Sequence, residues 1–277
     1  MQQDIKNFQK TVWQYHKKNR RDFPWRNTHD PYHILVSEIM LQQTQTIRVV
    51  SKYKEFLTRF PTVQKLAKAE LRDVLHLWQG LGYNRRAKFL YECAKEISEK
   101  YGGEFPKDLS TLKRLPGIGQ STAGAVLNFA FNIPTPFIET NIRTVFIHNF
   151  FPNHKTKVSD KEMLELINRT LDMKNPREWF YALYDYGSFL KSTLDADPAK
   201  QSSIYKKQSS FKGSFREKRS AVLKLLLNSK LRETQIEKHL LDNKLAKKKD
   251  SKEETRRILS SLLKDKLILK DKGFYFV

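Results

Sequence analysis

The stretch Leu115-Pro116-Gly117-Ile118-Gly119 runs directly into the helix-like segment Gln120-Ser121-Thr122-Ala123-Gly124-Ala125-Val126. Proline fixes its own φ, and the two glycines tolerate positive φ and leave no side chain in the way. Backbone N–H groups of the turn and of the following helix can therefore point at an anion. The spacing predicts a hairpin between two helices, with Gly117 and Gly119 close to a large anionic partner.

The charge of the chain indicates what that partner is. The formal net charge is +22, from 52 Lys and Arg against 30 Asp and Glu, and the isoelectric point is near 9.9. Such an excess favours a polyanion, with nucleic acid as the first candidate. An anionic membrane is the alternative, but no apolar run is long enough to span a bilayer, and Met1–Ile5 does not resemble a secretion signal. We expect a soluble, intracellular protein that makes no membrane contact.

Cys93 is the single cysteine, and its helical, mixed-polarity setting indicates a structural residue rather than a nucleophile. One cysteine cannot supply the four thiolates of an iron–sulfur or zinc site within one chain. We therefore expect no metal ligands and no iron–sulfur cluster.

The secondary-structure signal is helical almost throughout. Val63–Leu75 and Lys161–Ile167 both space their apolar residues at three and four, as amphipathic helices do. With 277 residues and 39% hydrophobic content, the chain is long enough for two or three compact units. The predicted fold class is all-α.

The composition changes after Asp195-Ala196-Asp197-Pro198, and we place a domain boundary around Gly213-Ser214. Beyond it the pattern predicts three helices and a β-hairpin that turns at Asp271-Lys272-Gly273: Arg219–Asn228, Thr234–Leu241, Lys252–Leu263 and Leu267–Val277. This is the plan of a winged helix-turn-helix. Its third helix, with Lys252, Arg256, Arg257 and Lys264, either contacts DNA or packs on the body or another protein, and we favour DNA.

Glu38 is the first catalytic candidate. It lies at an apolar, amide-rich helix start, Ser37–Thr46, where poor solvation would raise its pKa and let it hold a proton. Taken alone, such a residue is more often a surface or capping acid. The neighbouring Gln42 and Gln43 favour the catalytic interpretation, because glutamine can bind base edges or fill the gap left by an extruded base.

Glu139 is the second candidate. It follows an apolar, proline-containing stretch and precedes Asn141 and Arg143. Beside a protonated acid it would stay ionised and stabilise a positively charged sugar, and two such carboxyl groups suit cleavage of a glycosidic bond. Alone, Glu139 is equally consistent with an N-cap or a salt bridge.

Together these segments resemble the helix-hairpin-helix DNA glycosylases, and within them the adenine DNA glycosylases of the MutY type. The similarity runs from Phe23 to Phe151 and more weakly to Leu190. It rests on five motifs in the family's order: Phe23-Pro24-Trp25-Arg26, Ser37–Gln45, Trp78-Gln79-Gly80-Leu81-Gly82-Tyr83, Leu115–Ala125 and Glu139-Thr140-Asn141-Ile142-Arg143.

The resemblance implies roles for the two acids. Glu38 would protonate adenine at a ring nitrogen, and Glu139, in the place of the family's catalytic aspartate, would stabilise the oxocarbenium ion or attack C1′ transiently. Asn141 would support this carboxylate and the sugar-phosphate of the flipped nucleotide.

The resemblance also implies contacts to the DNA. Gln42, Gln43 and Tyr83 would enter the base stack around the extruded nucleotide. A backbone phosphate would be held by Gly117, Gly119, Ser121, Arg26 and Arg143, and a monovalent cation is possible at the Leu115–Gly119 hairpin. Family members that also cut the strand carry a lysine where this chain has Ser121, so we expect a monofunctional enzyme without strong lyase activity.

Three features depart from the family. Glu139 replaces an aspartate, so the carboxyl group lies one methylene further from the backbone. The region of the four-cysteine cluster, here Leu190–Asp195, contains no cysteine, so packing and basic residues such as Lys191 must replace the cluster's structural work. The winged-helix-like tail stands where typical members carry a domain that inspects 8-oxoguanine.

We therefore predict an all-α, two-lobed helix-hairpin-helix glycosylase fold with a C-terminal winged-helix-like domain. The predicted domains are residues 1–30 with 131–212, residues 31–130, and residues 213–277. The predicted function is removal of a flipped adenine mispaired with 8-oxoguanine or guanine, by a cytoplasmic, nucleoid-associated monomer without cofactor, on double-stranded DNA containing a mispair or damaged base. The alternatives are a mismatch glycosylase for another base, such as thymine opposite guanine, and a non-catalytic DNA-binding protein.

Overall fold

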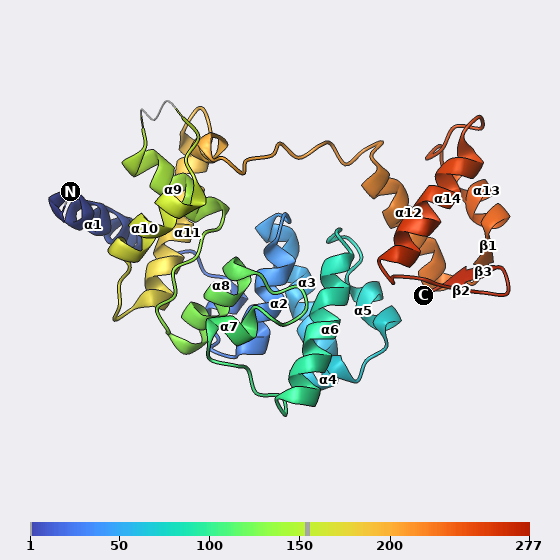
Figure 1. Ribbon diagram of the computed structural model, residues 1–277, viewed down its shortest axis with the longest axis horizontal. Coiled ribbons are helices and arrows are strands. Elements are labelled where there is room, and N and C mark those ends of the chain that lie inside the picture. The colour runs from blue at the N-terminus through green and yellow to red at the C-terminus, as the bar shows by residue number, and fades with distance from the viewer. Residues whose placement is uncertain (1, 153–155) are drawn as a thin grey trace. The chain divides into compact units, whose positions relative to one another are not determined.

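The computed structural model describes residues 2–152 and 156–277 (Figure 1). The chain forms two compact units. Unit 1 comprises Met1–Glu38 and Phe105–Lys207, and unit 2 comprises Ile39–Glu104 and Gln208–Val277. The predicted three-domain division stays a prediction, and its segment 31–130 contributes to both units. Among the described residues, no helix is both long and apolar enough to cross a bilayer.

Unit 1 is built from helices that pack around α11. Its elements are α1 (Gln2–Asn19), the 3-10 helix η1 (Pro24–Arg26), most of α2 (Pro31–Leu41), α7 (Leu109–Leu112), α8 (Gln120–Phe131), α9 (Thr140–Phe150), α10 (Asp160–Thr170), α11 (Pro176–Thr193) and η2 (Pro198–Gln201). Helix α11 contacts α9, α1 and α8. Stacked rings fill this core, with Phe129 and Tyr181 4.2 Å apart between centroids and 3° from parallel.

The glycine-containing turn has the predicted hairpin form. The Ile118 amide donates to the Leu115 carbonyl (3.2 Å), and Gly117 has a φ of 73°. Proline at the second and glycine at the third position identify a type II turn. Gly119 does not use its tolerance of positive φ: it is extended, with φ −94° and ψ −179°, and is the N-cap of α8. Any residue could adopt that conformation, so the backbone itself does not require glycine there.

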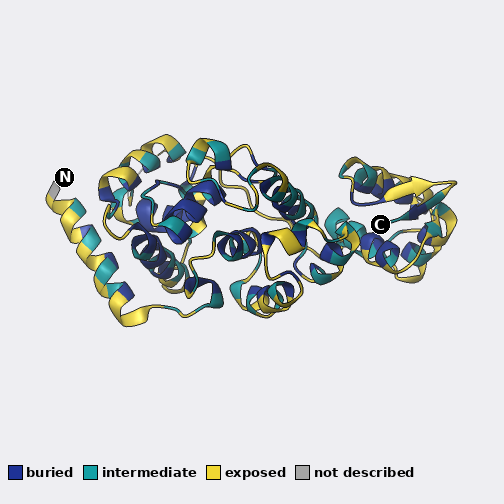
Figure 2. Cartoon of the chain, turned by 90° about the horizontal axis from the view of Figure 1, so that it is seen from below, coloured by how far each residue is buried: buried dark blue, intermediate teal, exposed yellow. Residues whose placement is uncertain are grey.

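Unit 2 begins with four helices: α3 (Thr46–Arg59), α4 (Val63–Ala67), α5 (Leu71–Leu77) and α6 (Arg85–Lys100). The single helix predicted over Val63–Leu75 is wrong, because the chain turns between α4 and α5. That turn lets both short helices pack on α6, with Leu66 and Leu75 fully buried. Buried residues line the inner sides of the helices and exposed residues their outer sides (Figure 2).

The C-terminal part of unit 2 confirms the predicted helices and hairpin (orange to red in Figure 1). It contains α12 (Phe215–Asn228), β1 (Leu231–Arg232), α13 (Glu233–Asp242), α14 (Ser251–Lys264), β2 (Leu269–Asp271) and β3 (Phe274–Phe276). The strands form an antiparallel sheet in the order β1-β3-β2, in which the short β1 was not predicted. Lys272 and Gly273 both have positive φ, as the two-residue turn of a tight hairpin needs.

Candidate active site

Glu38 lies in the last turn of α2 and is half-buried between Ser37 and Ile39. The predicted position at a helix start is therefore wrong, because α2 already begins at Pro31. Burial, together with the negative charge of Glu139, raises the pKa of Glu38 to about 8, against the opposing charge of Arg26 and a hydrogen bond from Tyr184. At neutral pH this carboxyl group holds a proton that it can donate.

Glu139 is the N-cap of α9. Its Oε1 accepts hydrogen bonds from the backbone N–H groups of Asn141 (2.6 Å) and Ile142 (2.9 Å), and its Oε2 accepts one from the Asn141 side chain (3.4 Å). Burial raises the pKa of Glu139, while the charge of Lys191 and the backbone N–H groups oppose that rise. The negative charge of Glu139 in turn contributes to the raised pKa of Glu38, so the two acids influence each other's protonation.

Ser121 and Asn141 also lie beside Glu139. The Ser121 hydroxyl donates to the carbonyl of Ile138 (2.8 Å), the residue before Glu139. Asn141 Oδ1 accepts a hydrogen bond from the Lys191 ammonium (3.0 Å). Sequence reasoning named Lys191 only as one of several basic residues in the region where the family has its cluster, whereas the structure places it next to the candidate carboxylate.

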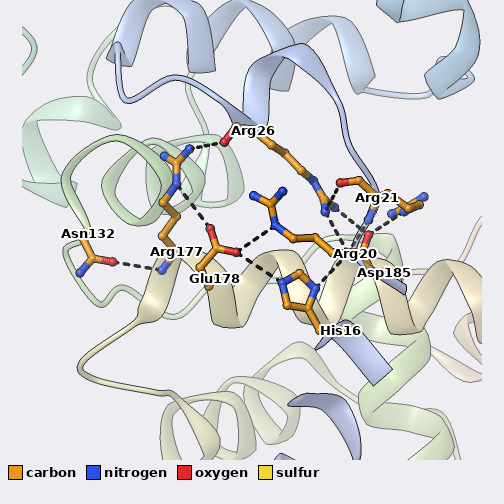
Figure 3. A network of polar contacts seen from close by, with 8 residues as sticks. All are labelled: His16, Arg20, Arg21, Arg26, Asn132, Arg177, Glu178 and Asp185. Carbon is orange, nitrogen blue, oxygen red and sulfur yellow. Dashed lines mark hydrogen bonds and ion pairs between the residues drawn. The ribbon is translucent and has the colours of Figure 1, made fainter. Parts of the chain in front are cut away.

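Arg26 and Arg143 correct the prediction of phosphate contacts, because both side chains are buried in internal ion pairs. The Arg26 guanidinium binds both oxygens of Asp185 (2.9 and 2.8 Å) and is 3% exposed (Figure 3). Arg143 is 8% exposed and is paired with Asp160 and with the Ser202 hydroxyl (2.8 Å). Neither guanidinium is presented to an external phosphate.

The ion pair of Arg26 belongs to a larger polar network around Asp185 that sequence reasoning missed (Figure 3). Asp185 also binds Arg21 (2.6 Å) and His16 (3.1 Å), and His16 reaches Glu178 (3.3 Å). Burial alone would lower the pKa of His16, but its hydrogen bonds to Asp185 and Glu178 outweigh burial and raise it. The only signal for this network was Arg26 in its motif, since Asp185 lies far along the chain.

The hairpin presents exposed backbone. Gly117 and Gly119 are exposed, and a Cβ added to Gly119 would meet no atom of the protein within 4 Å. Gly119 also offers no side-chain acceptor to the first amides of α8. The space at Gly119 and the start of a helix together suit the close approach of an anion.

Unit 2 carries Gln42, Gln43 and Tyr83. Gln42 and Gln43 are exposed in the turn after α2, and Gln43 has a φ of 54°. Tyr83 is 36% exposed with a φ of 47°. Positive φ is uncommon for such residues and persists only where the surroundings hold it.

Arg86 holds both of these turns, and sequence reasoning missed it. Its buried guanidinium donates to the carbonyls of Ile39 (2.7 Å), Gln42 (2.6 Å), Leu81 (3.0 Å) and Gly82 (3.1 Å). The Tyr83 hydroxyl in addition accepts a hydrogen bond from Arg216 (2.6 Å). One arginine therefore fixes the backbone on which all three predicted base-stack residues stand.

The side chains present do not fit a four-thiolate cluster. The sequence has one cysteine, Cys93, which is buried in α6, where burial raises the pKa of its thiol to about 12. Across residues 2–152 and 156–277, no group of three His, Cys, Asp or Glu side chains could hold a metal ion.

The hairpin between α7 and α8, Glu38 and Glu139 all belong to unit 1, in a helix-hairpin-helix fold. Residues 36–169 match the family described as HhH-GPD superfamily base excision DNA repair protein. The chain contains a domain of this superfamily.

Three curated relatives are named adenine DNA glycosylase. The identity is 38% over 176 residues for Buchnera aphidicola subsp. Baizongia pistaciae (64% of this chain, 50% of the relative). It is 43% over 132 residues for Mycobacterium tuberculosis strain CDC 1551 (47% and 43%) and 31% over 196 residues for Homo sapiens (67% and 36%). The chain spans about half the length of the Buchnera relatives.

Solved structures agree on the fold. A thermostable thymine-DNA glycosylase aligns with a TM-score of 0.63 and 27% identity, covering 71% of this chain and 91% of that one. A trapped endonuclease III–DNA intermediate aligns with a TM-score of 0.54 and 19% identity, covering 69% and 85%, which supports the fold alone.

Proposed function

We propose that this protein is a DNA glycosylase of base excision repair that hydrolyses the bond between deoxyribose and an adenine mispaired with 8-oxoguanine or guanine. The observation that carries the proposal is the presence in unit 1 of two acids in different surroundings: Glu38, whose pKa is raised to about 8, and Glu139, whose carboxylate caps α9 and accepts two backbone N–H groups. The names of the relatives, which are 31–43% identical to the chain, support adenine as the base.

The two acids divide the chemistry. Glu38 donates its proton to a ring nitrogen of the base, which weakens the N-glycosidic bond and lets the neutral base leave with the bonding electrons. Glu139 stabilises the positive charge that develops on the sugar, with Asn141 supporting it. Water then bonds to C1′ of the sugar cation and gives its proton to the Glu38 carboxylate, which leaves an abasic site and restores the acid.

Hydrolysis without strand cleavage is supported by Ser121. The family's strand-cutting members use a lysine at this place, and here a hydroxyl group donates to the Ile138 carbonyl instead. A hydroxyl cannot form the Schiff base that elimination requires. We propose a monofunctional enzyme on this ground.

The partner in this proposal is double-stranded DNA containing a mispair. The net charge of +22 supports phosphate contacts. The exposed hairpin at Gly117 and Gly119 would bind a phosphate of the DNA backbone. Gln42, Gln43 and Tyr83 would fill the stack around the flipped nucleotide. We further propose that the protein acts as a nucleoid-associated monomer without an iron–sulfur cluster, with a monovalent cation at the hairpin as a separate prediction.

A second candidate is excision of thymine opposite guanine. It is favoured by the structural similarity to a protein titled a thymine-DNA glycosylase, at 27% identity.

A single-turnover assay on three duplexes tests these proposals: adenine opposite 8-oxoguanine, adenine opposite guanine, and thymine opposite guanine, each with and without alkali. We expect alkali-dependent breaks in the adenine strand that Glu38→Gln and Glu139→Ala both remove. Breaks only in the thymine strand would favour the second candidate. Retarded bands in electrophoresis without an abasic product would identify a non-catalytic DNA-binding protein.

A further inference from the structure

Lys191 lies in the last turn of α11, and its contact with Asn141 continues toward Glu139. The ammonium donates to Asn141 Oδ1 (3.0 Å), and Asn141 Nδ2 donates to Glu139 Oε2 (3.4 Å). An ammonium group can only donate hydrogen bonds, so only one orientation of the Asn141 amide is compatible with it. In that orientation the amide oxygen faces Lys191 and the amide nitrogen faces the carboxylate. The reversed amide would place its oxygen against Glu139.

Gly187, one helical turn before Lys191, provides a second and independent contact with the same residue. A Cβ added to Gly187 would lie 2.4 Å from the Asn141 carbonyl oxygen and 2.8 Å from the Asn141 Cβ. Residues four apart share one face of a helix. The face of α11 defined by Gly187 and Lys191 therefore contacts both the backbone and the side chain of Asn141.

The charges around Glu139 favour this arrangement. Glu38, Tyr184 and the Lys191 ammonium are all close enough to Glu139 to feel its charge, and Lys191 also feels the charge of Asp197. The charge of Lys191 counteracts the rise that burial causes in the pKa of Glu139. Burial lowers the pKa of Lys191, and the carboxylates oppose that change.

We propose that Lys191 is a positioning residue for base removal: it orients the Asn141 amide, which in turn holds the Glu139 carboxylate at the start of α9. This inference rests on the proposed function and deepens it. It also explains why an additional positioning contact is needed here: Glu139 replaces the family's aspartate, and its longer side chain has one more rotatable bond to fix. The lysine comes from the region where the resemblance places cluster cysteines.

The test compares Lys191→Met with Lys161→Met, which removes an exposed lysine from the first turn of α10. Single-turnover base release is followed across a pH series. For Lys191→Met we expect about a tenfold lower rate at neutral pH and an acidic limb displaced to higher pH, because Glu139 loses the cation that favours its ionised form. Lys161→Met should keep the rate and the limb of the unaltered protein.

Rescue separates positioning from packing. In Lys191→Cys, alkylation with 2-bromoethylamine restores an ammonium group of nearly the original length. Cys93 does not compete, since it is buried with a thiol pKa of about 12. We expect recovery of both the rate and the acidic limb. The proposal would be overturned if alkylated Lys191→Cys did not recover its rate and Lys191→Met kept the acidic limb of the unaltered protein. Lys191 would then have a purely structural role.

A carboxyl titration makes the result independent of turnover. In protein labelled with ¹³C at glutamate carboxyl groups, with the Glu139 signal assigned by Glu139→Gln, the pKa of Glu139 should rise in Lys191→Met and not in Lys161→Met. An unchanged titration would overturn the inference. If the titration moves but no duplex loses a base, the arrangement stands and the proposed function fails.

Discussion

The carboxylates of unit 1 and the base-stack residues of unit 2 are held in place by different means. Glu38 and Glu139 are half-buried, and charged or hydrogen-bonding partners from other elements set their proton affinities. Gln43 and Tyr83 stand exposed at positive φ, and Arg86 fixes the backbone beneath them through carbonyl groups. Proton transfer needs a tuned pKa, which buried charges provide. Filling a base stack needs an exposed side chain on a rigid turn, which a backbone held at positive φ provides.

The largest expected effect breaks the chemistry and leaves the base-stack turns intact. Glu38→Gln keeps the shape of the side chain but removes its acidic proton, so base release should fall by about 10²- to 10⁴-fold. Single-turnover kinetics measure the rate, and mobility shift of the mispaired duplex measures binding, which should stay within about threefold. An equal loss of binding and rate would mean that Glu38 acts in recognition rather than in proton transfer.

Arg86→Met breaks the other side of the comparison. It should destabilise the protein by about 3 kcal/mol, because several buried carbonyl groups lose their donor at once. Urea unfolding measures the change. The matched control is Arg85→Met. The Arg85 side chain is 60% exposed, and its partner Asp265 keeps Arg219 as a second partner (2.6 Å), so this variant should cost about 0–1 kcal/mol. Equal midpoints for the two variants would contradict the role assigned to Arg86.

The pH dependence of the rate tests whether Glu38, of the two acids in unit 1, is the proton donor. Glu38 must be protonated to act, and its pKa is about 8, so base release should be retained at neutral pH and fall as the pH rises through about 8. Above that pH the rate should drop about tenfold per unit. Single-turnover rates measured with a fixed enzyme excess show the limb. A rate that keeps rising through pH 9 would exclude Glu38 as the acid.

Local patterns in the sequence predicted local structure well. The type II turn needs only proline and glycine in adjacent positions, and the terminal hairpin needs only a turn sequence between apolar runs, so both follow from a few consecutive residues. The α4–α5 segment did not follow, because its break depends on packing against α6.

Partners far apart in the sequence decided the rest of the site. The sequence was consistent with a phosphate contact by Arg26, but in the fold Arg26 pairs with Asp185. No residue near Arg86 in the sequence predicts its hydrogen bonds to the carbonyls of Ile39 and Gln42. Lys191 could be named as basic but not as the neighbour of Asn141. Charged side chains take their role from the partner that folding supplies.

The smallest expected effect tests whether unit 1 also uses backbone geometry. Gly117→Ala places a Cβ on a residue with a φ of 73° and should destabilise the free protein by about 1 kcal/mol. Gly119→Ala adds a Cβ to an extended residue with open space around it, so its stability should change by no more than about 0.5 kcal/mol, while the methyl group would stand where a phosphate approaches. Urea unfolding and duplex binding, measured on both variants, separate the two effects. Weaker binding by Gly119→Ala at unchanged stability means that the glycine serves the DNA rather than the fold; unchanged binding means that the hairpin is only a connection between two helices.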